Sequence, residues 1–140
     1  MTRDVKPEIY TSERCYIAEI LNEPEYPEVS LTRARVSPGV TTKLHTVTVI
    51  EWYVIESGTG RMQLGDAEPF DVGPGSVIRI PANVVQRIEN TCNDDLVFSC
   101  VCAPRWTCLL YTSPSPRDER RYLVCRLLLE KWGGGGGGGG

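Results

Sequence analysis

Residues 39–58 read GVTTKLHTVTVIEWYVIESG and residues 75–90 read GSVIRIPANVVQRIEN, and these two stretches decide the fold. Both begin with glycine and contain short segments, rich in β-branched residues, in which apolar and polar side chains alternate. Alternation with a period of two is typical of β-strands, and a glycine beside a strand supplies the backbone freedom that a tight reversal needs. The two stretches therefore predict consecutive antiparallel strands joined by short turns.

The same pattern extends on both sides of these stretches. Runs of Val, Ile, Tyr and Thr alternate with clusters of Gly, Pro, Asn or Asp, and no helical stretch competes. Strands are expected at about 15–21, 29–36, 43–48, 52–57, 60–64, 76–80, 85–90 and 96–102. Such strands close most readily into a barrel or a two-sheet jelly roll, since closure protects their edges, and an all-β fold follows. Within the last run, alternation should point Leu96, Phe98, Cys100 and Cys102 inward.

Five residues of the first stretch have the same spacing as the positions of a known motif. The pattern G(x)5HxH(x)3,4E(x)6G is met by Gly39, His45, Val47, Glu51 and Gly58, with valine in place of the second histidine. This pattern is the first motif of the cupin superfamily, which the stretch therefore resembles.

The second stretch resembles the other cupin motif, G(x)5PxG(x)2H(x)3N. Its positions are held by Gly75, Pro81, Asn83, Gln86 and Asn90, with asparagine for the second glycine and glutamine for the histidine. Asparagine is a suitable stand-in because it tolerates the left-handed conformation better than other non-glycine residues. The resemblance covers about half of the 140 residues and implies one small domain with the cupin-type double-stranded β-helix, or jelly-roll barrel.

The resemblance also implies a metal. In cupins that bind one, two His and one Glu of the first motif and one His of the second converge inside the barrel on Fe, Mn, Ni, Zn or a similar ion. Carried over to this chain, the ligands of a divalent transition metal would be His45, Glu51 and Gln86, while Val47 has no donor. An amide oxygen completes only a weak site, and His45 is the only histidine, so a metal-free site with His45 hydrogen-bonded to Glu51 stays open.

A metal-free site could still carry out acid/base chemistry or bind a substrate. Glu51 and His45, expected on neighbouring strands, can form an acid/base pair. Tyr53 shares a face with Glu51 and could act as a phenolic donor or base, as a tyrosine at this offset does in some cupin lyases, or could simply pack with its hydroxyl satisfied. Gln86 offers a substrate both a donor and an acceptor, and Cys102 borders the predicted cavity.

Taken together, these observations predict a cupin that binds a small polar organic molecule. It could be a metal-dependent enzyme of the oxygenase, isomerase or lyase type with a degenerate metal site. The alternative is a non-catalytic sensor that binds a sugar or an organic acid without metal, and a third possibility is a dimeric scaffold whose cavity is merely core. The resemblance further implies a homodimer, in which residues 6–21 are exchanged or cover an edge of the barrel.

Composition argues against several classes of partner. The formal net charge is -3 and the chain has no dense Lys/Arg run, so neither nucleic acid nor an anionic membrane surface is an expected partner. The first residues have no apolar leader core, and no apolar run approaches the roughly 18 residues of a membrane span. A soluble, cytoplasmic protein is expected, with its six cysteines present as reduced thiols.

Composition changes sharply after Trp106, and the chain ends in eight glycines. Residues 108–118 (CLLYTSPSPRD) and 122–129 (YLVCRLLL) back-translate to the two ends of a transposon adaptor used for sequencing libraries. We therefore predict that residues 1–107 form the cupin domain and that 108–140 are a non-native tail, disordered or loosely attached, as in a metagenomic sequence. A natural helix over 122–129 that docks on the barrel is the alternative.

Deletion of residues 108–140 tests this interpretation. Because a translated adaptor has no selected contacts with the barrel, the shortened chain should melt within about 2 °C of the full chain in a thermal denaturation experiment. A large loss of thermal stability would instead make the tail part of the folded protein.

Overall fold

Strands are the only regular elements in the part of the chain that the computed structural model describes, residues 7–107 and 111–112. They are β1 (Ile9–Tyr10), β2 (Tyr16–Leu21), β3 (Ser30–Val36), β4 (Thr46–Val47), β5 (Ile50–Ser57), β6 (Gly60–Leu64), β7 (Phe70–Val72), β8 (Val77–Ile80), β9 (Gln86–Asn90), β10 (Leu96–Ala103) and β11 (Tyr111–Thr112). The prediction of an all-β fold is confirmed. Over the same residues, the protein has no helix long and apolar enough to cross a membrane.

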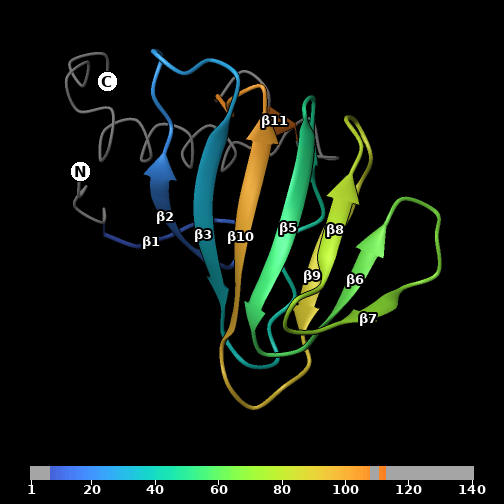
Figure 1. Cartoon of the computed structure of the whole chain (residues 1–140). Coiled ribbons are helices and arrows are strands. Elements are labelled where there is room, and N and C mark those ends of the chain that lie inside the picture. The colour runs from blue at the N-terminus through green and yellow to red at the C-terminus, as the bar shows by residue number, and fades with distance from the viewer. Residues whose placement is uncertain (1–6, 108–110, 113–140) are drawn as a thin grey trace.

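The strands form two main antiparallel sheets that enclose a core (Figure 1). The larger sheet has the order β1-β2-β3-β10-β5-β8, the smaller has the order β7-β6-β9, and β4 pairs with β11. Ile55 and Phe98 from the larger sheet belong to the same buried cluster as Met62 and Ile88 from the smaller one. The apolar side chains of the two sheets therefore meet between them, as in a small barrel.

Alternation along β10 and β5 decides which side chains enter the barrel. Leu96, Phe98, Cys100 and Cys102 are buried, as predicted, while the residues between them are half-buried. In the register of the two strands, Cys100 pairs with Tyr53 and Cys102 with Glu51. One face of this strand pair therefore carries the apolar core at one end and the polar residues of the motif at the other.

Most predicted strands lie within one or two residues of the observed ones, but the strand predicted at 43–48 is wrong in extent. Only Thr46–Val47 is a strand there, and residues before it make isolated bridges, Thr41 with Glu89 and His45 with Gln86. The short strands β1 and β7 were not predicted, because two or three residues show no period.

Tyr111–Thr112, which pairs with β4, falls in the predicted tail. The other residues of 108–140 lie outside the described residues, so the limits of the domain stay a prediction.

Gly58 and Asn83 are two of the motif positions whose left-handed backbones explain their residue types. Gly58 has a φ of 86°, and a Cβ added there would lie 2.7 Å from the carbonyl oxygen of Asp95. Asn83, which replaces a motif glycine, has a φ of 66°. The expectation that asparagine can adopt this conformation is thus confirmed, and the turn before β9 keeps the shape that places Gln86.

The last motif residue, Asn90, fastens the turn between β9 and β10. Its side-chain Nδ2 donates to the carbonyl oxygens of Val36 and Asp94, each at 2.8 Å, and its Oδ1 accepts from the backbone N–H of Cys92 at 2.9 Å. Asn90 is fully buried. Because the Asn90 side chain is out of contact with water, its amide depends on such bonds, and they stabilise the connection between the two sheets.

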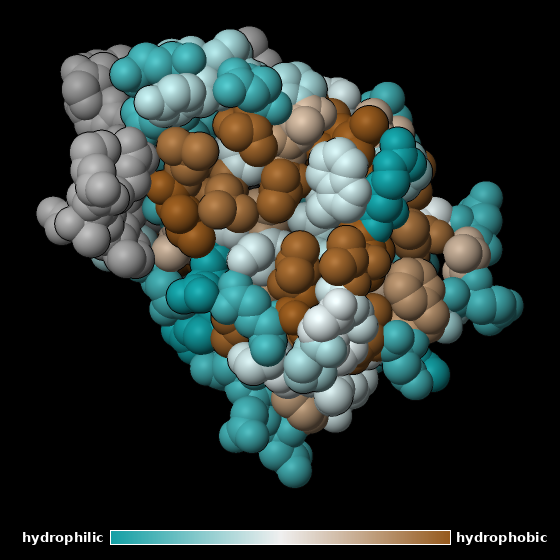
Figure 2. All heavy atoms as spheres, viewed as in Figure 1, coloured by the Kyte–Doolittle hydropathy of each residue, from teal (hydrophilic) through white to brown (hydrophobic). Residues whose placement is uncertain are grey.

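The outer face of the larger sheet is partly apolar. Figure 2 shows apolar side chains gathered on the face seen there, with hydrophilic ones around them. Along β5, β8 and β10, every second side chain is buried, and the side chains between them point to this outer face. They include Trp52, Val54, Val77 and Val101, of which Val77 is 63% exposed. Such a surface suits contact with another protein, but the predicted homodimer stays a prediction.

Asn90→Ala tests the role of this asparagine in the fold. The variant should lose about 3 kcal/mol of unfolding free energy in urea denaturation, because one buried and two partly buried backbone groups lose a partner. Asn93→Ala, at an exposed position on the same connection, is the matched control and should change stability by less than about 0.5 kcal/mol. Equal effects of the two substitutions would contradict the role assigned to Asn90.

Candidate functional site

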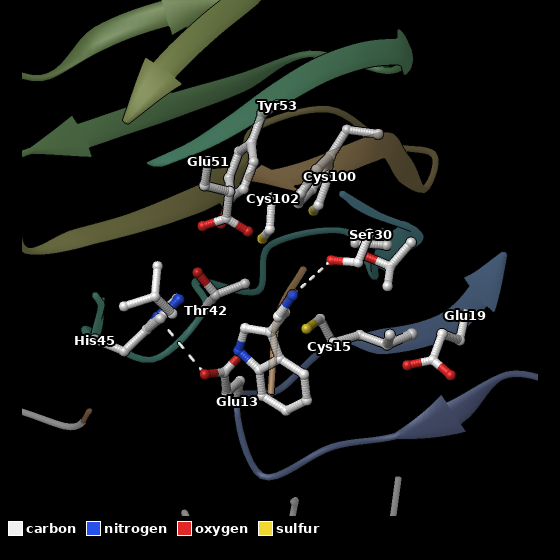
Figure 3. A pocket seen from close by; sticks show the side chains of 16 residues that line it. Glu13, Cys15, Glu19, Ser30, Thr42, His45, Glu51, Tyr53, Cys100 and Cys102 are labelled. Carbon is white, nitrogen blue, oxygen red and sulfur yellow. Dashed lines mark hydrogen bonds and ion pairs between the residues drawn. The ribbon is translucent and has the colours of Figure 1, made fainter. Parts of the chain in front are cut away.

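One cavity opens on the inner side of the larger sheet, and most of the predicted site residues line it. Its volume is about 80 Å³, and its walls come from β2, β3, β5, β10 and the turns that precede β2 and β4. His45, Glu51, Tyr53 and Cys102 all line it. Gln86 is not among the lining residues, because it is fully buried behind them. Figure 3 shows Glu51, Cys102 and His45 pointing into the same space.

His45 reaches the cavity from the side of the smaller sheet. Its backbone exchanges two hydrogen bonds with Gln86 of β9, at 3.1 and 2.9 Å. The expectation that His45 and Glu51 lie on neighbouring strands is therefore wrong, since β5 pairs with β8 and β10. Nδ1 of His45 lies 2.8 Å from the carbonyl oxygen of Lys43. A carbonyl only accepts, so this network assigns the hydrogen to Nδ1.

A chain of buried hydrogen bonds joins three of the predicted residues. The Tyr53 hydroxyl donates to Oε1 of Gln86 at 2.6 Å, and Nε2 of Gln86 donates to Oε1 of Glu51 at 2.9 Å. Tyr53 and Glu51 belong to the larger sheet, whereas Gln86 belongs to the smaller one. The amide therefore connects the two sheets through the core, and both of its ends have partners.

Burial controls the ionisation of this chain. It raises the pKa of the Glu51 carboxyl, against the opposing effects of His45 and of the hydrogen bond from Gln86. Burial, followed by the nearby Glu51, raises the pKa of Tyr53 well above its ordinary value. A buried ionisable group favours its neutral form. The tyrosine is consequently a protonated donor to Gln86, and Glu51 retains its proton to a higher pH than an exposed carboxyl does.

The thiols of the cavity are protonated for the same reason. Burial raises the pKa of Cys15 to about 12. Burial and then Glu51 raise the pKa values of Cys100 and Cys102 as well. Since the thiolate is the nucleophilic and metal-binding form, these thiols form part of the cavity wall and are not reactive groups.

The donors present do not fit the metal that the motif implies. Of the four equivalent positions, Val47 has no donor atom, and the amide of Gln86 is bonded to Tyr53 and Glu51. His45 and Glu51 then remain, whereas protein metal sites generally use three or four side chains. Within residues 7–107 and 111–112, no three His, Cys, Asp or Glu side chains are grouped so that they could hold a metal ion.

Sequence reasoning missed Glu13, which lies in the turn between β1 and β2. Its backbone N–H is bonded to the Thr11 hydroxyl at 3.2 Å, and its carbonyl oxygen accepts from Lys43. The side chain lines the cavity with Oε2 3.8 Å from Nδ1 of His45 (Figure 3). Glu13 is only 8% exposed, and its Oε2 has no hydrogen-bond partner. The residue precedes both motifs, so their spacing carries no information about it.

Known proteins resemble this chain in sequence and in fold. The uncharacterized protein MJ1618 of Methanocaldococcus jannaschii is 38% identical over 106 residues, which cover 74% of this chain and 83% of that protein. A predicted oxalate decarboxylase from Thermotoga maritima superposes with a TM-score of 0.62 at 24% identity, over 71% of this chain and 91% of that one.

KdgF from a Halomonas species superposes with a TM-score of 0.61 at 12% identity, over 74% of this chain and 90% of that one. At such identities the two superpositions show a shared fold and carry no information about activity. The family model for the cupin domain matches residues 32–102, which include both motifs and every predicted site residue. The chain therefore belongs to the cupin family.

Proposed function

We propose that this cupin binds a small polar organic molecule inside its barrel, in the cavity that Glu51 and His45 share. The hydrogen-bonded chain from Tyr53 through Gln86 to Glu51 carries this proposal. A buried polar chain is stabilising only when its members are satisfied. This one reaches Glu51, whose carboxyl also has a hydrogen bond with the Cys102 thiol and faces the cavity. A ligand in that cavity would add a further hydrogen bond to this carboxyl.

The residues have distinct roles in this proposal. Glu51, when protonated, can both donate to and accept from a ligand, and His45 can present Nε2 as an acceptor. Gln86 and Tyr53 act as positioning residues that hold the Glu51 carboxyl in place. If a reaction takes place, Glu51 is the group available for proton transfer, whereas the raised pKa of Tyr53 disfavours its use as a base.

Metal analysis combined with ligand screening tests the proposal. After dialysis against a chelator, the full chain should contain well under one equivalent of Fe, Mn, Ni or Zn, and its melting temperature should rise with members of a panel of small polyols, sugars, acids and amines. Glu51→Ala should abolish that rise, while Glu68→Gln, at an exposed site, should preserve it.

One equivalent of metal that survives dialysis in the wild type and is lost in His45→Ala would instead support the metal-dependent enzyme. A metal-free protein whose melting temperature responds to no member of the panel would contradict both functions and would support the scaffold.

The pKa of Glu51 gives a pH-dependent prediction for Glu51→Gln. The carboxyl titrates near 4.5 in the unfolded chain and at a higher pH in the folded one. As pH rises above 4.5, the unfolded state loses this proton first, so the wild type loses stability until the folded carboxyl also ionises. Relative to the wild type, Glu51→Gln should therefore become more stable as pH rises from about 4 to 8 in urea denaturation. A stability difference that does not change with pH would contradict the burial of an ionisable Glu51.

A further inference from the structure

The ionisable side chains that line the cavity are unbalanced in charge. Carboxyl groups come from Glu13, Glu19 and Glu51, and one imidazole comes from His45. Among the described residues, no lysine or arginine side chain lines the cavity. Glu19 accepts a hydrogen bond from Nδ2 of Asn22 at 2.9 Å. An anionic ligand would meet these carboxyl groups without a lysine or arginine beside them among the described lining residues, which disfavours organic acids.

The cavity also holds an acceptor without a donor. Oε2 of Glu13 is buried and has no hydrogen-bond partner, and Nδ1 of His45 lies 3.8 Å away, beyond hydrogen-bonding distance. That nitrogen already lies 2.8 Å from the Lys43 carbonyl oxygen. A buried carboxylate oxygen without a donor is costly in free energy. A donor brought by a ligand, and most effectively a positively charged one, would remove this cost.

An aromatic wall completes the site. Trp106 lines the same cavity and packs against the cluster of Val47, Val49 and Cys102. Its backbone N–H donates to the Ser30 hydroxyl at 2.9 Å, and its carbonyl oxygen accepts from Asn22 at 3.1 Å, so the residue is fixed at both ends. Indole is the aromatic group that attracts cations most strongly.

From these three observations we propose that the ligand is a small organic ammonium ion whose N–H groups donate to Glu13 and whose carbon chain contacts Trp106. The inference rests on the proposed function and specifies the chemical class of its ligand. A cavity of about 80 Å³ accommodates roughly five to eight water-sized groups, which limits the ligand to a similar number of heavy atoms. A divalent metal would also supply positive charge, but the described residues provide no group of three donors to hold it.

Three probes with the same carbon chain test the charge preference on the full chain in buffer that contains a chelator. n-Butylammonium, 1-butanol and n-butyrate are titrated into ¹⁵N-labelled protein, and dissociation constants are taken from the shifts of the backbone amides of His45 and Glu51. We expect n-butylammonium to bind at least about tenfold more tightly than 1-butanol, since charged hydrogen bonds are roughly twice as strong as neutral ones. n-Butyrate should not saturate the site.

Two substitutions then locate the preference. Glu13→Gln keeps the shape of the side chain but removes its charge. It should therefore weaken the binding of n-butylammonium by about tenfold, to the affinity of 1-butanol, and leave the affinity for 1-butanol unchanged. Glu68→Gln, at an exposed position, should leave all three constants unchanged. If Glu13→Gln does not fold, the affinities of the wild type for the three probes still test whether the cavity prefers an ammonium ion.

Tighter or equal binding of 1-butanol or n-butyrate would overturn the ammonium inference and leave the proposed function standing. The same holds if none of the three probes binds while a sugar or an acid raises the melting temperature. If no compound of either kind binds, the inference and the proposed function fail together.

Discussion

The amide side chain of Gln86 is the constraint on which the site depends. It extends from β9 of the smaller sheet to β5 of the larger one, where it accepts from Tyr53 and donates to Glu51. At the position where the cupin motif has a metal-binding histidine, this chain has a neutral link between the two walls of its barrel. The link fixes the rotamer of Glu51 and removes an amide oxygen that could have bound a metal. The carboxyl groups of Glu13, Glu19 and Glu51 then dominate the charge of the cavity lining.

That character follows from burial. A carboxyl, a phenol and three thiols are buried around one cavity, and burial raises the pKa of each of them. Groups in this state bind through hydrogen bonds and shape, and they do not act as nucleophiles. The acceptor atom of Glu13 is the exception, because it has no donor within the described residues. The same low-polarity environment that protonates the thiols makes this oxygen the atom with the most to gain from a ligand.

Motif spacing predicted the parts of this structure that local geometry controls. Alternation with a period of two was enough to put Glu51 and Tyr53 on one inward face, and the left-handed turn at Asn83 followed from the known tolerance of asparagine. Spacing could not show what the inward side chains meet across the barrel. The Tyr53–Gln86 bond depends on how two distant strands face each other, and Glu13 enters the cavity from a turn outside both motifs. For the same reason, the strand expected at 43–48 proved to be the two-residue strand β4, which pairs with β11, and a single bridge from His45 to β9, since pairing there is set by distant residues and not by the local sequence.

The side-chain amide of Gln86 itself offers the most direct test of this account. Nuclear magnetic resonance can follow its two NH₂ protons while the solvent is exchanged for deuterium oxide and while Glu51 is titrated. A buried link predicts that these protons exchange much more slowly than those of the half-buried Gln63 and that their shifts follow the titration of Glu51. The opposite result would be fast exchange, chemical shifts that do not change as Glu51 is titrated, and resonances that broaden when Mn²⁺ is added. It would contradict a buried link and would make Gln86 a metal ligand.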